Sequence, residues 1–345
     1  MKHVPLRENP GRRTIIKRLL ISVGVLAVCI AGAIWIGHYL DPGRGQDEPR
    51  GDLDSRFTSA PAVEYNGAQY TPKKNLTTIL LMGTDHYTDD TSAEDSYRNG
   101  GQADFLVLVV IDTQNKTITP IQIDRDTMAR VTILGVMGDK TGTRNAQICL
   151  AHGFGDGKEQ SCLLQRDAVS GLFFDVKIPF YIAMRLDGIS ALNDAAGGVT
   201  VTIKDDFTRF DPQMQIGSTL TLQGKQAEYF VRNRKGMEVG TNEARAKRQT
   251  EYWDALVQTM DAQLRTQEDS DFLHVFFKKI DPYLVKNLTS GRIINELWKD
   301  RDYTRESMIH LSGEYKIGED GFMEFHADEA ALKALVMRLF YQKVG

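Results

Sequence analysis

The chain has 345 residues, of which 41% are hydrophobic and 26% are charged, a composition typical of a globular protein with one large or two small domains. Its formal net charge of −4 is uneven, because residues 1–18 hold six basic residues and one acidic residue, which leaves −9 for the remainder. An acidic main domain argues against nucleic acid as a partner, since nucleic-acid binding needs a basic face.

The segment after the basic N-terminus predicts a transmembrane helix. Residues 19–40 contain no Asp, Glu, Lys or Arg, and these 22 residues suffice to cross a hydrocarbon core of roughly 30 Å. Trp35 and Tyr39 lie near the far end, where an aromatic belt is expected. The positive-inside rule places residues 1–18 in the cytoplasm. A signal peptide cleaved near residues 31–33 is the alternative, but the apolar stretch continues past that point, which favours an uncleaved anchor.

The rest of the chain is expected outside the cell membrane, in a single-pass protein. Residues 41–75 are rich in Pro, Gly, Asp and Arg without periodic apolar residues, which predicts an extracytoplasmic linker. No break interrupts residues 76–345, so we expect one domain there. Cys149 and Cys162 would meet an environment in which a disulfide persists. Two small buried hydrophobic side chains are the alternative.

Strand and helix patterns interleave along this domain. Apolar or alternating runs predict strands at 78–82, 105–111, 117–123 and 199–203, and residues 180–192 have a mixed pattern. Helices are expected at 160–174, 225–231, 242–260 and 330–340. The order predicts an α/β fold, with α+β as the alternative, in which a central mixed sheet is flanked by helices on both sides.

A hairpin with charges at its open end is the most informative feature of the domain. Residues 105–111 and 117–123 flank a polar turn. If the turn centres between residues 114 and 115, Asp104 lies opposite Arg125, with Asp126 next to it. Charges at the ends of buried strands are costly unless they are paired or bound to a ligand. This edge of an α/β sheet is also where chemistry is usually placed.

The helix predicted at 242–260 carries a core-facing stripe that becomes cationic. Trp253, Leu256, Val257 and Met260 recur at helical spacing, and two steps of four residues back from Trp253 give Gln249 and Arg245. Asn242 is a suitable N-cap, and a helix N-terminus attracts anions. An arginine on the buried side there indicates a bound anion or, alternatively, a structural carboxylate.

Further charges complete a candidate diphosphate site. Arg232 and Arg234 alternate in a segment expected to be extended, so both guanidinium groups share a face and can bind a phosphate together. Asp85 and Asp104 each stand at a strand end. Carboxylate and phosphate oxygens together suit Mg²⁺, although the two acids can also be turn residues that pair with Arg125.

Seven segments in this order resemble the LytR-CpsA-Psr family of cell-envelope proteins: ILLMGTD (79–85), QADFLVLVVID (102–112), ITPIQIDRDT (118–127), GGVTVTI (197–203), LQGKQAEYFVRNR (222–234), NEARAKRQ (242–249) and VKNLT (285–289). The resemblance implies an extracytoplasmic α/β domain with an apolar pocket for a polyprenyl tail. It implies a Mg²⁺-dependent phosphotransferase that moves a glycopolymer from a polyprenyl-pyrophosphate carrier to peptidoglycan in cell-wall assembly.

The resemblance also implies residue roles. The metal ligands would be Asp85 and Asp104. The pyrophosphate-binding set would be Arg125, Arg232, Arg234, Arg245 and Gln249. Of these, Arg125, Arg232 and Arg234 would also act in catalysis, together with Asp126. For the pocket, Phe173, Phe174, Phe180 and Tyr181 are candidate lining residues, with plain core as the alternative.

The chain departs from the family pattern at charged positions. Gln102 stands where the family usually has arginine, and Asn242 where it usually has aspartate. Arg98, in the polar insertion of residues 86–101, is a candidate replacement cation. These departures keep a second hypothesis open, a catalytically weakened protein that binds polyprenyl phosphate and regulates or scaffolds envelope assembly. Direct DNA binding is disfavoured, because the chain lacks a helix-turn-helix pattern and only residues 1–18 would be cytoplasmic.

Overall fold

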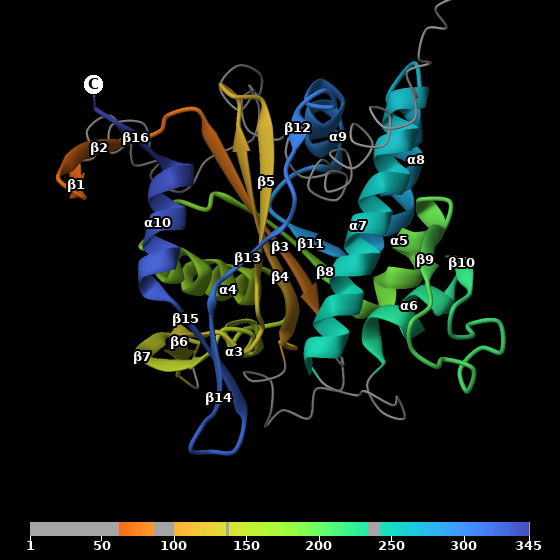
Figure 1. Cartoon of the computed structure of the whole chain (residues 1–345), viewed down its shortest axis with the longest axis horizontal. Coiled ribbons are helices and arrows are strands. Elements are labelled where there is room, and N and C mark those ends of the chain that lie inside the picture. Colours follow the sequence, from red (N-terminus) through yellow and green to blue (C-terminus); the bar gives the residue numbers. More distant parts are fainter. Residues whose placement is uncertain (1–61, 86–99, 136–137, 234–241, 345) are drawn as a thin grey trace, which may run out of the picture.

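The computed structural model describes residues 62–85, 100–135, 138–233 and 242–344. Its centre is a seven-stranded mixed sheet with the order β11-β8-β3-β4-β5-β12, in which β13 also pairs with β5 (Figure 1). The strands are β3 (Leu76–Thr84), β4 (Ala103–Asp112), β5 (Thr117–Ile123), β8 (Phe180–Arg185), β11 (Leu284–Lys286), β12 (Thr304–Arg305) and β13 (Ile309–His310). β3 pairs antiparallel with β4 and parallel with β8.

The β4–β5 hairpin has the register that its sequence predicts. Leu106 pairs with Ile123 and Asp112 with Thr117, so the turn centres between residues 114 and 115. Asp112 holds this turn, because one carboxylate oxygen accepts the backbone N–H groups of Gln114 (3.1 Å) and Asn115 (2.9 Å). Continued by two residues beyond the paired region, the register sets position 104 opposite position 125.

Two hydrophobic cores lie on opposite faces of the sheet, because successive strand residues point to opposite sides. Ile79 and Leu81 of β3 belong to one core, whereas Leu80 and Met82 belong to the other. Each face of a strand buried on both sides must be covered, and an unbroken apolar run such as residues 105–111 is the sequence pattern of such a strand.

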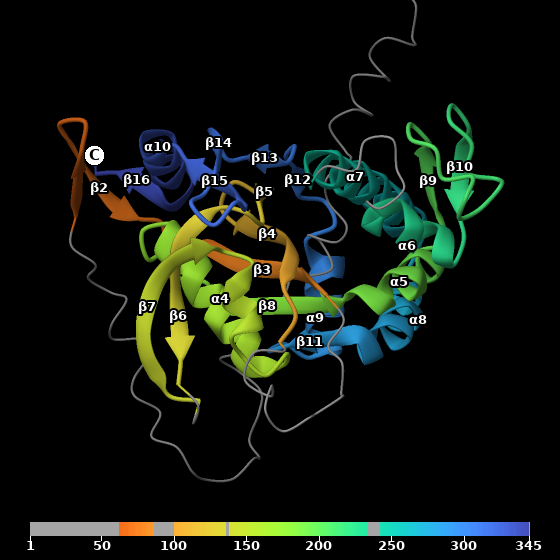
Figure 2. The same cartoon turned by 90° about the horizontal axis from the view of Figure 1, so that it is seen from below.

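Helices cover both faces, as Figure 2 shows with the sheet between them. One face is covered by α5 (Ile189–Ala195), α6 (Lys225–Arg232), α7 (Asn242–Thr266), α8 (Asp271–Ile280) and α9 (Ser290–Lys299). The other is covered by α3 (Leu150–Gly153), α4 (Glu159–Leu172) and α10 (Glu329–Phe340). The mixed α/β architecture with helices on both sides of the sheet is therefore confirmed.

Four smaller pairings surround this core. They are β1 (Val63–Tyr65) with β2 (Ala68–Pro72) and β16 (Tyr341–Lys343), β6 (Met128–Leu134) with β7 (Lys140–Gln147), β9 (Val199–Thr202) with β10 (Thr219–Leu222), and β14 (Gly313–Ile317) with β15 (Met323–Ala327). Residues 63–72, which lie in the predicted linker, thus form two strands, and β2 pairs with the C-terminal strand. The apolar periodicity missed them because β1 and β2 are short and neither contains a buried residue.

Among the described residues, no helix has the length and hydrophobicity needed to cross a bilayer. The predicted transmembrane segment at 19–40 lies outside those residues, as do most of the predicted linker and the cytoplasmic tail. Cys149 and Cys162 are both buried and free, so the alternative of two small hydrophobic side chains is the one found. Burial raises the pKa of each thiol to about 12.

Candidate active site

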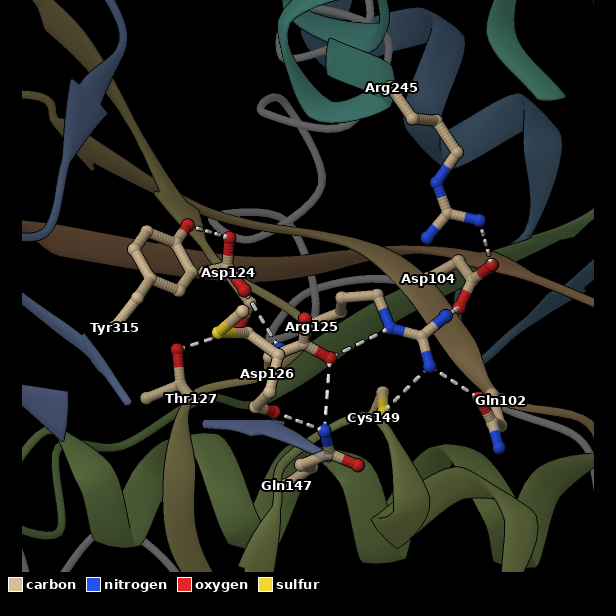
Figure 3. A network of polar contacts seen from close by, with 11 residues as sticks. Gln102, Asp104, Asp124, Arg125, Asp126, Thr127, Gln147, Cys149, Arg245 and Tyr315 are labelled. Carbon is tan, nitrogen blue, oxygen red and sulfur yellow. Dashed lines mark hydrogen bonds and ion pairs between the residues drawn. The ribbon is translucent and has the colours of Figure 1, made fainter. Parts of the chain in front are cut away.

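Arg125 lies at the centre of a polar network just beyond the end of β5 (Figure 3). Its Nη1 forms an ion pair with Asp104 Oδ1, and its Nε donates to Asp126 Oδ1 at 3.2 Å. Its Nη2 donates to Gln102 Oε1 at 2.5 Å and contacts Cys149 Sγ at 3.5 Å. All three guanidinium nitrogens are therefore engaged, and the predicted pairing of Arg125 with Asp104 is present.

Arg245 reaches the same carboxylate from the first turns of α7. Its Nη1 lies 2.9 Å from Asp104 Oδ2, and the two side chains are 6% and 14% exposed. Each oxygen of Asp104 therefore bonds an arginine from a different part of the chain. The stripe predicted on α7 is confirmed, because Trp253 and Val257 are buried in line with Arg245. Of the two sequence hypotheses for Arg245, a bound anion or a structural carboxylate, the structure shows a carboxylate partner. That partner, Asp104, is itself a candidate site residue.

Asp85 follows β3 and lies beside this cluster. Its backbone N–H donates to the carbonyl of Gln102 at 2.9 Å, which fixes the end of β3 against the start of β4. Burial raises the pKa of the Asp85 carboxyl, and the negative charge of Asp104 raises it further, while three arginines oppose the shift. The Asp85 carboxylate makes no hydrogen bond to the described residues. Asp85 is thus a half-buried acid without a direct ion-pair or hydrogen-bond partner for its carboxylate among the described residues.

Arg232 and Gln249 approach from α6 and α7. Arg232 is the last residue of α6, its side chain is 54% exposed, and it pairs with Glu228 one turn earlier at 2.9 Å. Gln249 Nε2 lies 3.4 Å from the carbonyl oxygen of Val231. Both residues line the same pocket as Asp85. Arg234 and Arg98 lie outside the described residues, and α7 begins at Asn242.

Arg248 is a functional candidate that the sequence analysis did not select. It is buried on α7 and donates from Nε to the carbonyl of Phe230 at 3.0 Å and from Nη2 to that of Asn233 at 2.5 Å. Its Nη1 pairs with Asp205 at 2.7 Å. It therefore satisfies carbonyls at the C-terminal end of α6 and holds the segment that carries Arg232. The sequence signal that could have identified Arg248 is its position three residues after Arg245 in the segment NEARAKRQ, which places both arginines on neighbouring parts of one helix face.

An apolar pocket opens beside these charges, between the sheet and helices α5, α7 and α8. It encloses about 1090 Å³ including its open mouth. Its walls include Leu186, Ile189, Leu256, Phe277 and Ile280, and its polar members include Asp85, Asp104, Arg232 and Gln249. The candidate lining residues Phe173, Phe174, Phe180 and Tyr181 are not among those that form it. Phe173 and Tyr181 belong instead to the core on the opposite face of the sheet. A shift of one position along a strand is enough to turn a side chain to the other face.

The acids of the site offer two protein ligands for a metal. Within the described ranges, no three His, Cys, Asp or Glu side chains gather in a group able to hold a metal ion. Asp104 is close enough to Asp85 for its negative charge to raise the pKa of the Asp85 carboxyl. Mg²⁺ commonly takes one or two carboxylates and completes its shell with water and substrate phosphates. Two neighbouring acids at the mouth of a pocket fit that requirement.

Fold and site together define an α/β domain suited to an amphiphile with an apolar body and an anionic head. A model of the LytR_cpsA_psr family matches residues 52–339, and the chain therefore belongs to the LytR-CpsA-Psr family.

Curated relatives and solved structures agree with this membership. The chain is 26% identical over 275 residues, 79% of this chain and 81% of the relative, to a Bacillus cereus (strain AH820) protein named polyisoprenyl-teichoic acid–peptidoglycan teichoic acid transferase TagU. It is 28% identical over 220 residues, 64% of this chain and 65% of the relative, to the protein of that name from Halalkalibacterium halodurans. The crystal structure of B. subtilis TagV has the same fold, with a TM-score of 0.60, 21% identity and coverage of 77% and 96%.

Proposed function

We propose that this protein is a transferase that moves a glycopolymer from a polyprenyl-pyrophosphate carrier to peptidoglycan outside the cell membrane. The observation that supports it most is the opening of a large apolar pocket directly onto Asp85, Asp104 and Arg232. The two parts of the site match the two parts of such a carrier. A polyprenyl tail gains free energy by leaving water for apolar walls, and a diphosphate is bound by guanidinium groups.

The proposed reaction exchanges the phosphoanhydride bond of the carrier for a new phosphoester bond to the acceptor. A hydroxyl oxygen of the acceptor forms a bond to the phosphorus that carries the glycopolymer. The bond from that phosphorus to the bridging oxygen breaks, and polyprenyl phosphate leaves with the electron pair. The hydroxyl proton passes to solution. Phosphoryl transfer depends mainly on positioning and charge stabilisation, so no protein nucleophile is needed.

The arginines divide this work according to their surroundings. Arg125 is engaged at every guanidinium nitrogen and holds Asp104 and Asp126 in place. Arg232 is half-exposed at the pocket, and within the described part of the chain its ion pair is with Glu228 on its own helix. A surface pair of this kind contributes about 0.3–0.5 kcal/mol, so a diphosphate displaces it readily. We therefore assign direct phosphate binding first to Arg232. The sequence adds Arg234, two positions further along the chain.

Mg²⁺ is the cofactor that we propose for this site, with Asp85 and Asp104 as its protein ligands. When bound, it neutralises charge that develops on the leaving phosphate. Asp85 suits this role because its carboxylate is half-buried beside a second acid, an arrangement that a cation relieves. Asp104 contributes while it also accepts from Arg125 and Arg245.

The second hypothesis is a binding protein that regulates or scaffolds envelope assembly without turnover. The engagement of both Asp104 oxygens by arginine favours it, because ligation of a metal competes with those ion pairs. Transfer of label from a polyprenyl-pyrophosphate-linked glycan to peptidoglycan, measured with the purified full chain, separates the two. Transfer that stops with EDTA and returns with Mg²⁺ supports the enzyme. Tight carrier binding without any release of polyprenyl phosphate would reject it.

A single-pass anchor at residues 19–40 with a cytoplasmic N-terminus is part of the proposal. It would hold the catalytic domain at the membrane surface, where the carrier resides. Alkaline phosphatase fused after Gly345 should be active and fused after Arg18 inactive, because the enzyme functions only outside the cytoplasm. The reverse pattern would overturn the orientation.

A further inference from the structure

The β14–β15 hairpin is an apolar arm that projects from the domain (Figure 1). Every residue of β14 is exposed. Tyr315, Ile317, Phe322 and Met323 are 49%, 74%, 64% and 40% exposed, and they make up four of the nine large apolar side chains exposed in the described part of the chain. Such a concentration on one hairpin is typical of a binding surface rather than of scattered surface residues.

This arm is hydrogen-bonded to the loop that carries Arg125. The Tyr315 hydroxyl donates to one carboxylate oxygen of Asp124 at 2.6 Å, and the other accepts the backbone N–H of Asp126 at 2.8 Å (Figure 3). The N–H of Phe325 donates to the carbonyl of Asp126 at 2.8 Å. Gln147 Nε2 bonds both the Met323 carbonyl, at 2.6 Å, and Asp126 Oδ1, at 3.2 Å. The arm thus begins at the charged cluster itself.

The arm and the pocket lie on opposite sides of the sheet. Leu311 and Ala327, at the base of the hairpin, pack against the core that contains α4 and α10, whereas the pocket walls Leu256 and Phe277 belong to the core beneath α7 and α8. Figure 2 shows the β14–β15 hairpin on one side of β3 and β4, and helices α7 and α8 on the other. In phosphoryl transfer the attacking and leaving oxygens are roughly in line through phosphorus. A carrier tail in the pocket therefore directs the acceptor toward the side of the arm.

The chemistry of the arm suits a saccharide. Residues 313–327 hold four acids and one lysine, a net charge of −3 with His326 neutral. That charge repels an anionic polymer or an anionic membrane surface. Sugar rings present apolar C–H faces that pack on aromatic and aliphatic side chains, and their hydroxyls donate to carboxylates. Exposed Tyr315 and Phe322 beside Glu319 and Asp320 provide both kinds of contact.

We propose that the β14–β15 hairpin is the docking arm for the acceptor glycan strand and delivers its hydroxyl to the loop of residues 124–127. This inference rests on the proposed transfer function, since it names the place of the second substrate. It extends the site to a surface on the side of the sheet away from the apolar pocket. It also assigns a use to apolar side chains that the core does not need.

The test compares two double variants of the full chain. Ile317→Ser/Phe322→Ser removes the most exposed apolar side chains of the arm. Ile216→Ser/Val275→Ser removes two apolar side chains outside the arm that are 60% and 58% exposed, against 74% and 64% for the arm pair. With soluble uncross-linked peptidoglycan strands as acceptor, the arm variant should raise the acceptor KM roughly tenfold, the scale expected for losing two apolar anchors of an interface. The carrier KM, the melting temperature and the control variant should stay unchanged.

A second measurement separates this proposal from the proposed function. Binding of the same strands to the protein without carrier needs no turnover and should weaken roughly tenfold in the arm variant. If the wild type shows no transfer but binds the strands about tenfold more tightly than the arm variant does, the transferase proposal fails and the docking-arm proposal is supported. Equal strand binding by both variants would sink the docking arm. So would an arm variant that loses binding to anionic phospholipid vesicles while its strand binding is unaffected.

Discussion

Asp104 accepts an arginine on each of its carboxylate oxygens, and this single residue joins β4, the loop after β5 and the first turns of α7. Taking three charges out of water is costly, and the pairing offsets that cost only while every partner is present. Asp104 therefore supports the site mechanically as well as electrostatically. Replacing Asp104 should therefore lower the stability of the folded domain even without substrate.

Asp104→Asn should lower the free energy of unfolding by about 3 kcal/mol, because it removes the negative charge with which the largely buried side chains of Arg125 and Arg245 both pair. Urea denaturation of the soluble domain measures this. Asp187→Asn is the matched control, since Asp187 pairs with Arg185 where both side chains are more than a third exposed, and its effect should stay within about 0.5 kcal/mol. Equal effects of the two substitutions would contradict a structural role for Asp104.

Asp85 gives the site a pH dependence of predictable sign. Its pKa is raised in the folded protein, chiefly by burial and then by Asp104, so the ionised form is less favourable in the folded state than in the unfolded state. Asp85 therefore costs stability at neutral pH. That cost disappears as the pH falls through the folded-state pKa and then the unfolded-state pKa.

Asp85→Asn should consequently raise the melting temperature at pH 7, and its advantage over the wild type should shrink as the pH is lowered through the raised pKa of Asp85 toward its unfolded value. Differential scanning fluorimetry at a series of pH values follows this without substrate or metal. The same variant should lose Mg²⁺-dependent transfer. A pH-independent difference in melting temperature would show that burial of the charge is not the cause.

At the scale of elements, α6 and α7 hold the positions of Arg232 and Arg245 at the candidate site. Arg248 of α7 bonds the carbonyls of Phe230 and Asn233 and lies over the ring of Phe207. Those carbonyls end α6 and would otherwise be left without partners. The position of Arg232 thus depends on a buried cation of the neighbouring helix.

Arg248→Met should weaken carrier binding several-fold, seen as a higher carrier KM, and should lower the free energy of unfolding by about 2 kcal/mol through lost charge-assisted hydrogen bonds. Lys247→Met is the control, because Lys247 is the exposed neighbour on the same helix. A carrier KM that is unchanged in Arg248→Met would show that Arg232 keeps its place without this contact.

At the scale of the whole molecule, one sheet carries two cores, and each buried thiol lies in the core that contains α4 or at its edge. Cys162 is fully buried in that core, and Cys149 is fully buried beside Arg125. Both pKa values are raised to about 12 by burial. Because the reactive form is the thiolate, neither thiol should react while the sheet is intact.

Alkylation with iodoacetamide at pH 8 should therefore leave Cys149 and Cys162 unmodified in the folded protein and modify both above the melting temperature. Mass spectrometry of a Cys29→Ser variant isolates these two thiols, because the chain has three cysteines. The two should become reactive together, since one sheet supports both cores and unfolds as a unit. Ready labelling of either thiol in the cold would contradict the burial.

The main strands and helices of the domain, the register of the β4–β5 hairpin and hence the meeting of Asp104 with Arg125 could be predicted from the amino-acid sequence alone. These follow from short-range rules: period two in strands, 3.6 residues per turn in helices, and the symmetry of a turn. The sequence also indicated that Arg245 belongs to the buried face of its helix.

Which side of the sheet each element covers became known from the packing of the folded domain. That packing placed the pocket beneath α5, α7 and α8 rather than at the candidate aromatic residues 173, 174, 180 and 181. It brought Arg248 to the end of α6 and both arginines to one carboxylate. It also set the β14–β15 arm beside Asp124. Contacts such as those of Arg245 with Asp104 and of Tyr315 with Asp124 join residues 141 and 191 positions apart. They depend on how whole faces pack, and no local pattern encodes that.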